Sequence, residues 1–353
     1  MARFECNRCH DGTGLPDETE ERHCVHCHQS IRAGTFDAPA RELQRWRANL
    51  HSLNDAPSLA GLEGKLRVEW LAEFLVSPHD VRPGLPATMP RLPLSPDEAR
   101  DIAAALAGSG SAEGDASAIG DPGEGLALLV RHSCLSCHAF SGAGVRRPAL
   151  AEGPAVALAP DLRHTRQRMT RSMLLRWLEA PAELRPGTLM PTVEMSREDR
   201  EHLADAILGA ALAPMDATPV PDRLPVLDRP VGFDEVADRV LSPTCWHCHA
   251  DADFAAGEAG AGNTGGFGFE ARGVNLLDYT GVSSGYIADD GERRSLFASD
   301  AGVPHLVRLL MARHHEVRGH AVPGLTGMPL GLPPIPIEDI QLVETWIAQG
   351  RPN

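Results

Sequence analysis

All eight cysteines of the 353-residue sequence belong to one repeated pattern, in which two residues separate a pair of cysteines and a histidine follows directly. Two thiols at this spacing can add to the two vinyl groups of one porphyrin, and the histidine can then ligate the iron. The pattern predicts covalently attached haem c at four places, with no cysteine left for a disulfide. In chain order these are motif 1 (residues 6–10: Cys6, Cys9, His10), motif 2 (24–28: Cys24, Cys27, His28), motif 3 (134–138: Cys134, Cys137, His138) and motif 4 (245–249: Cys245, Cys248, His249).

The closeness of motifs 1 and 2 permits a second interpretation. The 14 residues 10–23 separate Cys9 from Cys24, which is just short of the usual spacing of a zinc ribbon. Four thiolates could then hold one zinc ion. A zinc ribbon does not need His10 and His28 at the same offset, so two haems are the favoured interpretation.

A repeat after motifs 2 and 3 supplies candidates for the sixth iron ligand. Both copies contain Trp-Leu, a Pro, Arg-Pro-Gly and Met-Pro, in this order. Proline and glycine make a stiff loop that can hold a thioether against the iron. A methionine in that position raises the reduction potential of the haem. Met89 and Met190, which occupy the same place in the repeat, are therefore the predicted sixth ligands at motifs 2 and 3.

Motif 4 is followed by a larger segment that ends in a similar way. A glycine-rich stretch (256–269) comes first, and a Met-Pro pair and a final amphipathic segment come much later. Met328 is the predicted sixth ligand at motif 4. The long insertion leaves three histidines as alternatives: His314, His315 and His320.

The segments that close the two repeats carry strong helix-start signals. Ser95 with Glu98 forms a capping box, and Pro96 stands at the first helical position. Ser196 with Asp199 is the equivalent pair in the second repeat. We therefore expect a helix after each methionine loop.

A helix leading into the motif, a methionine loop and a closing helix together resemble the class I cytochrome c family. The resemblance covers residues of about 20–108 and about 121–212. Residues 231–353 resemble a larger cytochrome c domain with a long insertion. It implies a mainly α fold of tandem small all-α cytochrome c domains with long irregular Gly/Pro-rich loops. The predicted domains are a dihaem region at 1–108, a second domain at 121–212 and a third, larger domain at 231–353. The expected apolar helix faces are Leu126, Leu129 and Val130 before motif 3, and Ile340, Val343, Trp346 and Ile347 at the end of the chain.

Motif 1 has no methionine loop of its own. The nearest histidines in sequence are His23, His26, His51 and His79. Resemblance to multihaem cytochromes with closely spaced motifs suggests a bis-histidine first haem. The alternative is an open sixth position, which would permit ligand binding or peroxide chemistry.

The net charge of −15 argues against nucleic acid or an anionic membrane surface as a partner and favours basic or dipolar redox proteins. No apolar run is long enough to span a membrane. Membership of a membrane-associated complex is left open.

Haem c chemistry implies the bacterial periplasm or the outer cell surface. No signal-peptide pattern precedes Cys6, so this interpretation needs an export signal outside the sequence.

These features together predict a tetrahaem c-type cytochrome that relays electrons between redox partner proteins. An electron carrier is favoured over an enzyme, because no nucleotide loop, nucleophile elbow or paired-carboxylate pattern stands out. Two alternatives stay open. One is a haem enzyme, a peroxidase or small-molecule reductase, with an open first haem. The other is a trihaem cytochrome with an N-terminal zinc site.

Overall fold

The computed structural model describes residues 1–353 except 86–87, 109–121, 147–152, 216–217 and 252–259. Helices dominate the described residues and the strands are short, which confirms the predicted mainly α fold class. The chain forms two compact units, which we treat separately. Unit 1 comprises Met1–Ala60, Ala87–Leu94 and Pro219–Asn353, and unit 2 comprises Gly61–Pro86 and Ser95–Thr218. The three sequence domains stay a prediction, because compact units and sequence domains need not coincide.

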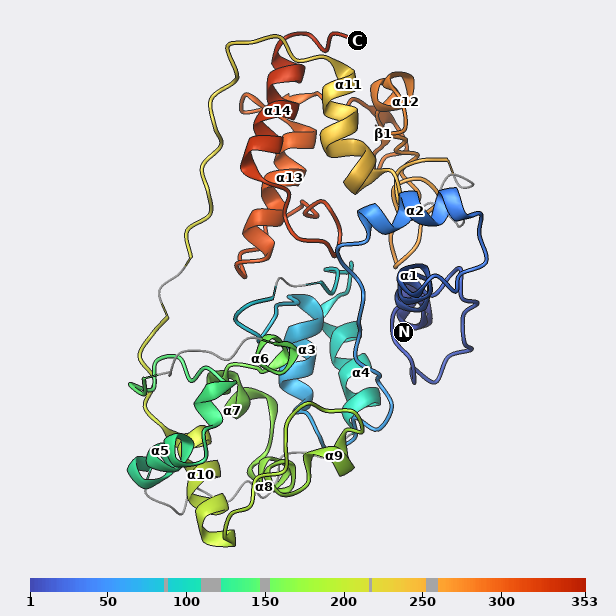
Figure 1. Ribbon diagram of the computed structural model, residues 1–353. Coiled ribbons are helices and arrows are strands. Elements are labelled where there is room, and N and C mark those ends of the chain that lie inside the picture. The colour runs from blue at the N-terminus through green and yellow to red at the C-terminus, as the bar shows by residue number, and fades with distance from the viewer. Residues whose placement is uncertain (86–87, 109–121, 147–152, 216–217, 252–259) are drawn as a thin grey trace. The chain divides into compact units, whose positions relative to one another are not determined.

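Unit 1 contains motifs 1, 2 and 4 (Figure 1). Its helices are α1 (Cys24–Ala33), α2 (Ala40–Asn49), α11 (Phe233–Val236), α12 (Tyr279–Ser284), α13 (His305–Glu316) and α14 (Ile337–Ala348). Two 3-10 turns, η1 (Ala2–Phe4) and η2 (Cys6–Arg8), begin the chain, and the π-helix η5 (Ala237–Cys245) continues α11 into motif 4. Two antiparallel pairs are formed by β1 (Tyr286–Ile287) with β2 (Arg293–Arg294) and by β3 (Ser299–Asp300) with β4 (Val303–Pro304).

The core of unit 1 forms where α11, η5, α13 and α14 meet. Trp346 is its largest fully buried side chain, and aromatic rings pack edge-on or tilted against it from Phe233, Tyr279 and Phe297. Burial of such a ring contributes roughly 3–5 kcal/mol relative to alanine. Ile340, Val343 and Trp346 are buried as predicted, and Ile347 is partly buried at the edge of the core.

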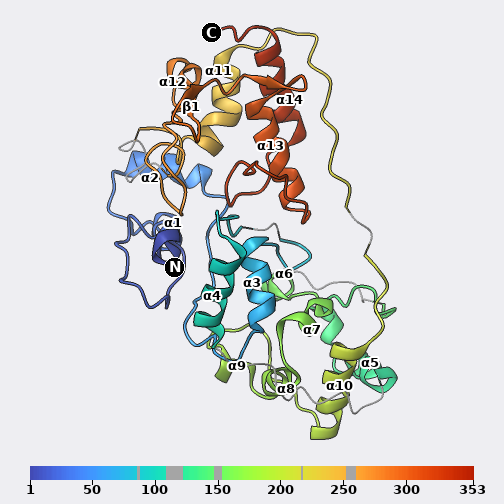
Figure 2. The ribbon, with the colours of Figure 1, turned by 180° about the vertical axis from the view of Figure 1, so that it is seen from behind.

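Unit 2 contains motif 3 and is all helical in its described residues (Figure 2). Its α-helices are α3 (Val68–Val76), α4 (Pro96–Ala107), α5 (Pro122–Arg131), α6 (Pro154–Leu158), α7 (Thr165–Arg168), α8 (Arg171–Glu179), α9 (Pro181–Leu184) and α10 (Arg197–Gly209). Its 3-10 turns are η3 (Cys134–Ser136) and η4 (Leu162–His164).

The crossing of α5 and α10 organises the core of unit 2. Gly125 permits the close approach, because a Cβ there would collide with the carbonyl oxygen of His202 and with Ala206. Leu128 and Leu129 are fully buried at the crossing, but Val130 is 61% exposed. The predicted apolar face was therefore wrong at Val130, because the face that α10 covers includes Gly125 and Leu128 instead.

The predicted helix starts are confirmed. The Ser95 side chain accepts from the Glu98 amide, and the Glu98 side chain accepts from the Ser95 amide, so α4 has a complete capping box. At α10 the Ser196 side chain accepts from the Asp199 amide. Each cap satisfies a helix N–H that would otherwise lack a partner and contributes about 1 kcal/mol.

Candidate haem-binding sites

The motifs share one local turn. The histidine amide donates to the carbonyl oxygen of the first cysteine at 3.0 Å in motif 1, 2.9 Å in motif 3 and 2.9 Å in motif 4. Motif 2 occupies the first turn of α1. Residues at offsets of three and four lie on one face of such a turn. Both cysteines and the histidine of each motif can therefore face one planar group.

Three motif histidines are oriented by backbone carbonyl oxygens. Nδ1 of His10 lies 2.7 Å from the oxygen of Pro57, and Nδ1 of His138 lies 2.8 Å from that of Pro160. Nδ1 of His28 lies 3.1 Å from the oxygen of Leu53. A carbonyl oxygen can only accept, so Nδ1 carries the proton and Nε2 keeps its lone pair. That is the tautomer a histidine needs to bind metal through Nε2.

His249 of motif 4 is positioned by packing instead. A Cβ at Gly262 would collide with its imidazole ring, so glycine is needed at this place. The carbonyl oxygen of His249 accepts from the Leu276 amide at 2.6 Å, and the Trp246 indole donates to the oxygen of Leu276 at 2.7 Å. Nδ1 of His249 is buried without a protein partner, and its burial lowers the pKa of His249 to about 4. The ring is therefore held neutral.

Two residues of motif 4, His247 and Cys248, are exposed to solvent. The neighbouring protein raises the pKa of the Cys248 thiol to about 11 and lowers the pKa of His247 to about 4, in each case mainly by desolvation. The exposure of Cys248 leaves its thiol accessible for attachment of a porphyrin.

Met190, the predicted sixth ligand of motif 3, belongs to the core of unit 2. Its side chain and that of Cys134 pack against the same core of unit 2. The indole Nε1 of Trp177 donates to Sδ of Met190 at 2.9 Å. A thioether sulfur has a second lone pair, so this contact orients the sulfur and leaves it able to bind iron. The ligand role of Met190 stays a prediction.

A buried ion pair holds the loop of Met328. Glu316, 5% exposed, accepts from the Gly327 amide at 2.7 Å and faces the Arg313 guanidinium at 3.3 Å. Arg313, 2% exposed, donates to the carbonyl oxygen of Leu332. The Met328 amide donates to the oxygen of Leu309, and its side chain packs against the core that Cys245 also touches.

The three alternatives to Met328 lie in different surroundings. His314 donates through Nε2 to the carbonyl oxygen of Ile335 at 2.9 Å, and its Nδ1 is buried without a hydrogen-bond partner. His320 is exposed, and His315 is partly exposed. The choice of Met328 over these histidines stays a prediction.

The two copies of the methionine repeat differ in the structure. Trp177 and Met190 lie in one unit, whereas Trp70 belongs to unit 2 and Met89 to unit 1. The Met89 loop thus shares a unit with motif 2, although its flanking helices α3 and α4 do not. A sequence repeat does not determine which core each half joins, because that depends on long-range packing.

The histidines near motif 1 form a small cluster with Asp11. Nε2 of His23 and Nε2 of His26 lie 3.5 and 3.3 Å from the two carboxylate oxygens of Asp11, and the rings stack at 3.6 Å. His23 is 3% exposed, and its Nδ1 accepts from the His26 amide, which places the proton on Nε2. In this tautomer Nε2 of His23 carries a hydrogen near the Asp11 carboxylate, without meeting hydrogen-bond geometry, and has no lone pair for iron.

Of the other two candidates for motif 1, His51 is exposed in unit 1 and His79 belongs to unit 2. The sixth position of motif 1 therefore stays open between a histidine and an exchangeable ligand.

The cysteine arrangement gives little support to an N-terminal zinc ribbon. Cys9 and Cys24 hydrogen bond to each other, which lowers the pKa of Cys24 to about 7 and raises that of Cys9. Within the described part of the chain, which includes every cysteine, no three sulfurs lie within 4.8 Å of one another. A zinc ion bound by four thiolates needs such a cluster.

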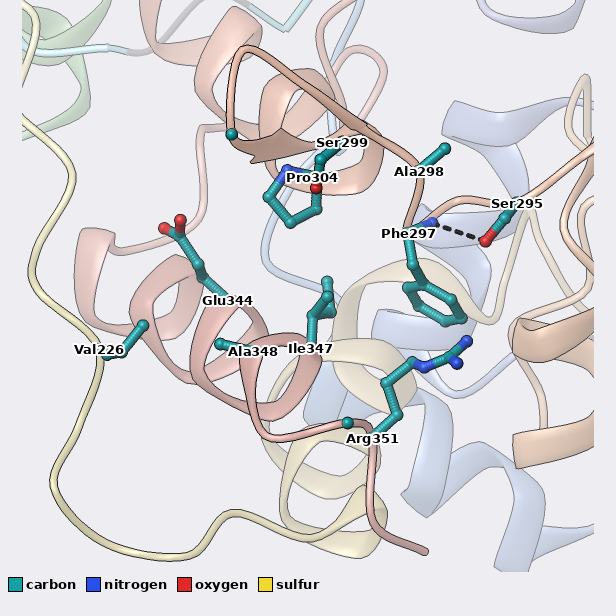
Figure 3. A pocket seen from close by; sticks show the side chains of 12 residues that line it. Val226, Ser295, Phe297, Ala298, Ser299, Pro304, Glu344, Ile347, Ala348 and Arg351 are labelled. Carbon is teal, nitrogen blue, oxygen red and sulfur yellow. Dashed lines mark hydrogen bonds between the residues drawn. The ribbon is translucent and has the colours of Figure 1, made fainter.

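A separate surface pocket of about 650 Å³ lies beside the C-terminal half of α14 (Figure 3). Phe297 and Ile347 form part of its apolar wall, and the Arg351 guanidinium stacks over the Phe297 ring at 4.5 Å. Its carboxylate, Glu344, pairs with Arg223. No motif residue lines this pocket, so we assign it no role at the haem sites.

Sequence reasoning missed the residues that orient the ligands. These are the carbonyl groups of Pro57 and Pro160, the close approach at Gly262 and the buried Arg313–Glu316 pair. The two carbonyl groups and the close approach at Gly262 have no local pattern. Arg313 and Glu316 stand three residues apart on one helix, so their spacing could have indicated the pair. Trp177 belongs to the second copy of the repeat and could have been identified as a partner of Met190.

Comparison with known proteins gives one family match. Residues 124–209 match the family model described as Cytochrome c. No curated protein and no solved structure matched the chain. Among the residues that the structure describes, no helix is long and apolar enough to cross a membrane. The chain thus contains a cytochrome c domain around motif 3, which implies covalently bound haem c and electron transfer with redox partner proteins.

Proposed function

We propose that the chain is a tetrahaem c-type cytochrome, which relays electrons between donor and acceptor proteins in the periplasm or on the outer cell surface. The observation that carries this proposal is the contact of Nδ1 with a backbone carbonyl in His10, His28 and His138. His138 lies inside the matched cytochrome c domain. The contacts of His10 and His28 give motifs 1 and 2 the same tautomer as His138, with the proton on Nδ1 and the lone pair on Nε2. The proposal extends the haem count from that domain to all four motifs.

Haem c, when bound, supplies a one-electron couple. The residues of the chain attach it, hold its axial ligands and set its potential. The cysteine pairs anchor the porphyrin, and the motif histidines ligate the iron. Met89, Met190 and Met328 are the proposed sixth ligands, and each raises the potential of its site relative to a second histidine.

The acidic charge of the chain favours basic partner surfaces. A net charge of −15 steers a basic partner by long-range attraction. Salt screens that attraction over about 8–10 Å at physiological ionic strength. We therefore expect association with redox partners to slow as salt is added. Association with a membrane complex is compatible with this proposal.

The decisive experiment counts covalent haems. The chain is expressed with an export signal and the haem-maturation machinery, and its intact mass is measured together with a redox titration. We expect four haems, and one fewer in each double Cys→Ala variant, such as Cys6→Ala with Cys9→Ala. Three haems and one zinc ion would overturn the tetrahaem proposal and support the zinc alternative.

One observation favours a second candidate function at motif 1. Nδ1 of His23 accepts from the His26 amide, which leaves the proton on Nε2, so this histidine is not arranged to ligate the iron. An open first haem would bind carbon monoxide in the reduced native protein and would permit peroxidase or reductase chemistry. Absence of carbon monoxide binding would exclude this candidate and leave electron relay alone.

A further inference from the structure

Motifs 2 and 4 lie side by side in unit 1, although they are far apart in the sequence. The ring centroids of His28 and His247 are 6.3 Å apart. Both rings belong to attachment motifs, so the two motifs are neighbours in space.

A buried cation marks the same place. Arg8, 7% exposed, belongs to motif 1, and its guanidinium stacks over the Phe267 ring at 5.0 Å. The Phe267 amide donates to Oε2 of Glu5 at 2.9 Å. The segment that follows motif 4 therefore also packs against motif 1.

The methionine loops of motifs 2 and 4 are also neighbours. A Cβ at Gly331 would lie 3.0 Å from the carbonyl oxygen of Thr88 and 3.4 Å from Pro90. The Arg91 guanidinium lies 3.7 Å from the Glu316 carboxylate that holds the Met328 loop. Both the attachment residues and the predicted sixth-ligand loops of the two motifs thus lie next to each other.

We propose that the haem sites of motifs 2 and 4 form a directly coupled pair, between which an electron passes without visiting motif 3. This inference rests on the proposed function. The step transfers one electron from one iron to the other, so one site is oxidised while the other is reduced, and no bond or proton changes. The redox partner proteins supply and remove that electron. The order of electron transfer therefore differs from the order of the motifs in the chain.

The test uses circular dichroism in the Soret region, on the full chain with its haems attached. Two haems in close proximity produce a paired positive and negative signal, which isolated haems do not. The variant Cys245→Ala with Cys248→Ala removes site 4, and Cys134→Ala with Cys137→Ala removes site 3 as a matched control. We expect the paired signal to lose intensity in the site 4 variant and to persist in the site 3 variant. The reciprocal variant, Cys24→Ala with Cys27→Ala, removes site 2 and should lose the paired signal as well.

The outcomes separate this inference from the proposed function. Intact mass reports how many haems each variant holds, so fewer than four haems in the unmodified protein count against the tetrahaem proposal. Four haems without a paired signal overturn the coupling alone. A paired signal that survives removal of site 4 assigns it to motifs 1 and 2 and also overturns the coupling. If the site 4 variant does not fold, Cys6→Ala with Cys9→Ala replaces it: a paired signal that survives removal of site 1 cannot come from motifs 1 and 2, whereas loss of the signal overturns the coupling of motifs 2 and 4.

Discussion

Nδ1 of His138 lies 2.8 Å from the carbonyl oxygen of Pro160, and the next residue, Asp161, fixes the position of that carbonyl. Oδ1 of Asp161 accepts from the amides of Ser141 and Arg163, and its side chain is buried. One buried carboxylate thus positions the group that orients the proximal histidine. Electron-transfer sites depend on such oriented ligands, because the surrounding hydrogen bonds tune the metal.

Asp161→Ala should destabilise unit 2. The substitution leaves the partly buried amides of Ser141 and Arg163 without their acceptor, at a cost of about 1 kcal/mol for each group. The free energy of unfolding of the haem-loaded protein, measured in guanidinium, reports the loss. Asp97→Ala is the control, because Asp97 is exposed and forms only a surface pair with Arg100. Equal effects of the two substitutions would contradict this role of Asp161.

Trp177→Phe should lower the reduction potential at motif 3. The ring is kept, but the donor to Sδ of Met190 is lost, so the sulfur becomes a stronger donor to oxidised iron. Redox titration and the sulfur-to-iron charge-transfer band measure the change. Trp70→Phe is the matched control, because Trp70 occupies the same place in the first repeat and the hydrogen bond to Met190 comes from Trp177. An unchanged potential in Trp177→Phe would show that the contact does not persist with iron bound.

Gly262→Ala should impair haem attachment at motif 4. The added methyl group occupies the place of the His249 ring and displaces the proposed proximal ligand. We expect intact mass to show a fraction of chains with one haem fewer, and the other motifs to be unaffected. Gly232→Ala is the control in the same unit, since nothing lies within 4 Å of the position that its added methyl group would take. Full loading of Gly262→Ala would mean that the His249 segment can shift.

Glu316→Gln should destabilise the Met328 loop. The change leaves the buried Arg313 charge without its partner, which costs about 3–5 kcal/mol. Thermal unfolding and the potential of the motif 4 site should both change. Glu338→Gln, on the exposed side of α14, should stay within about 0.5 kcal/mol of the parent. Similar stability of the two variants would argue against the buried pair as the support of Met328.

Gly125→Ala should weaken the crossing of α5 and α10. The extra methyl group collides with backbone and side-chain atoms of α10, and overpacking of this kind costs about 1–3 kcal/mol. Denaturant unfolding measures the loss. Gly84→Ala, with open space around it, is expected to be neutral. A neutral Gly125→Ala would require the two helices to move apart, which a structure of the variant would reveal.

Local sequence patterns predicted the local structure well. Ser95 and Glu98 identified the start of α4, because a capping box is formed by residues three positions apart. Ile340, Val343 and Trp346 identified the buried face of α14. The prediction failed at Val130, because the identity of the partner helix decides which face of α5 is covered.

The sequence by itself predicted the chemistry: four candidate attachment motifs, the Met-Pro loops and the mainly α class follow from residue types at short spacing. Only the tertiary structure decided which motifs share a unit. It groups motif 4 with motifs 1 and 2, assigns Trp70 and Met89 to different units, and places the carbonyl of Pro160 beside Nδ1 of His138. The physical reason is that attachment depends on one helical turn, whereas proximity depends on hydrophobic packing between segments far apart in the chain.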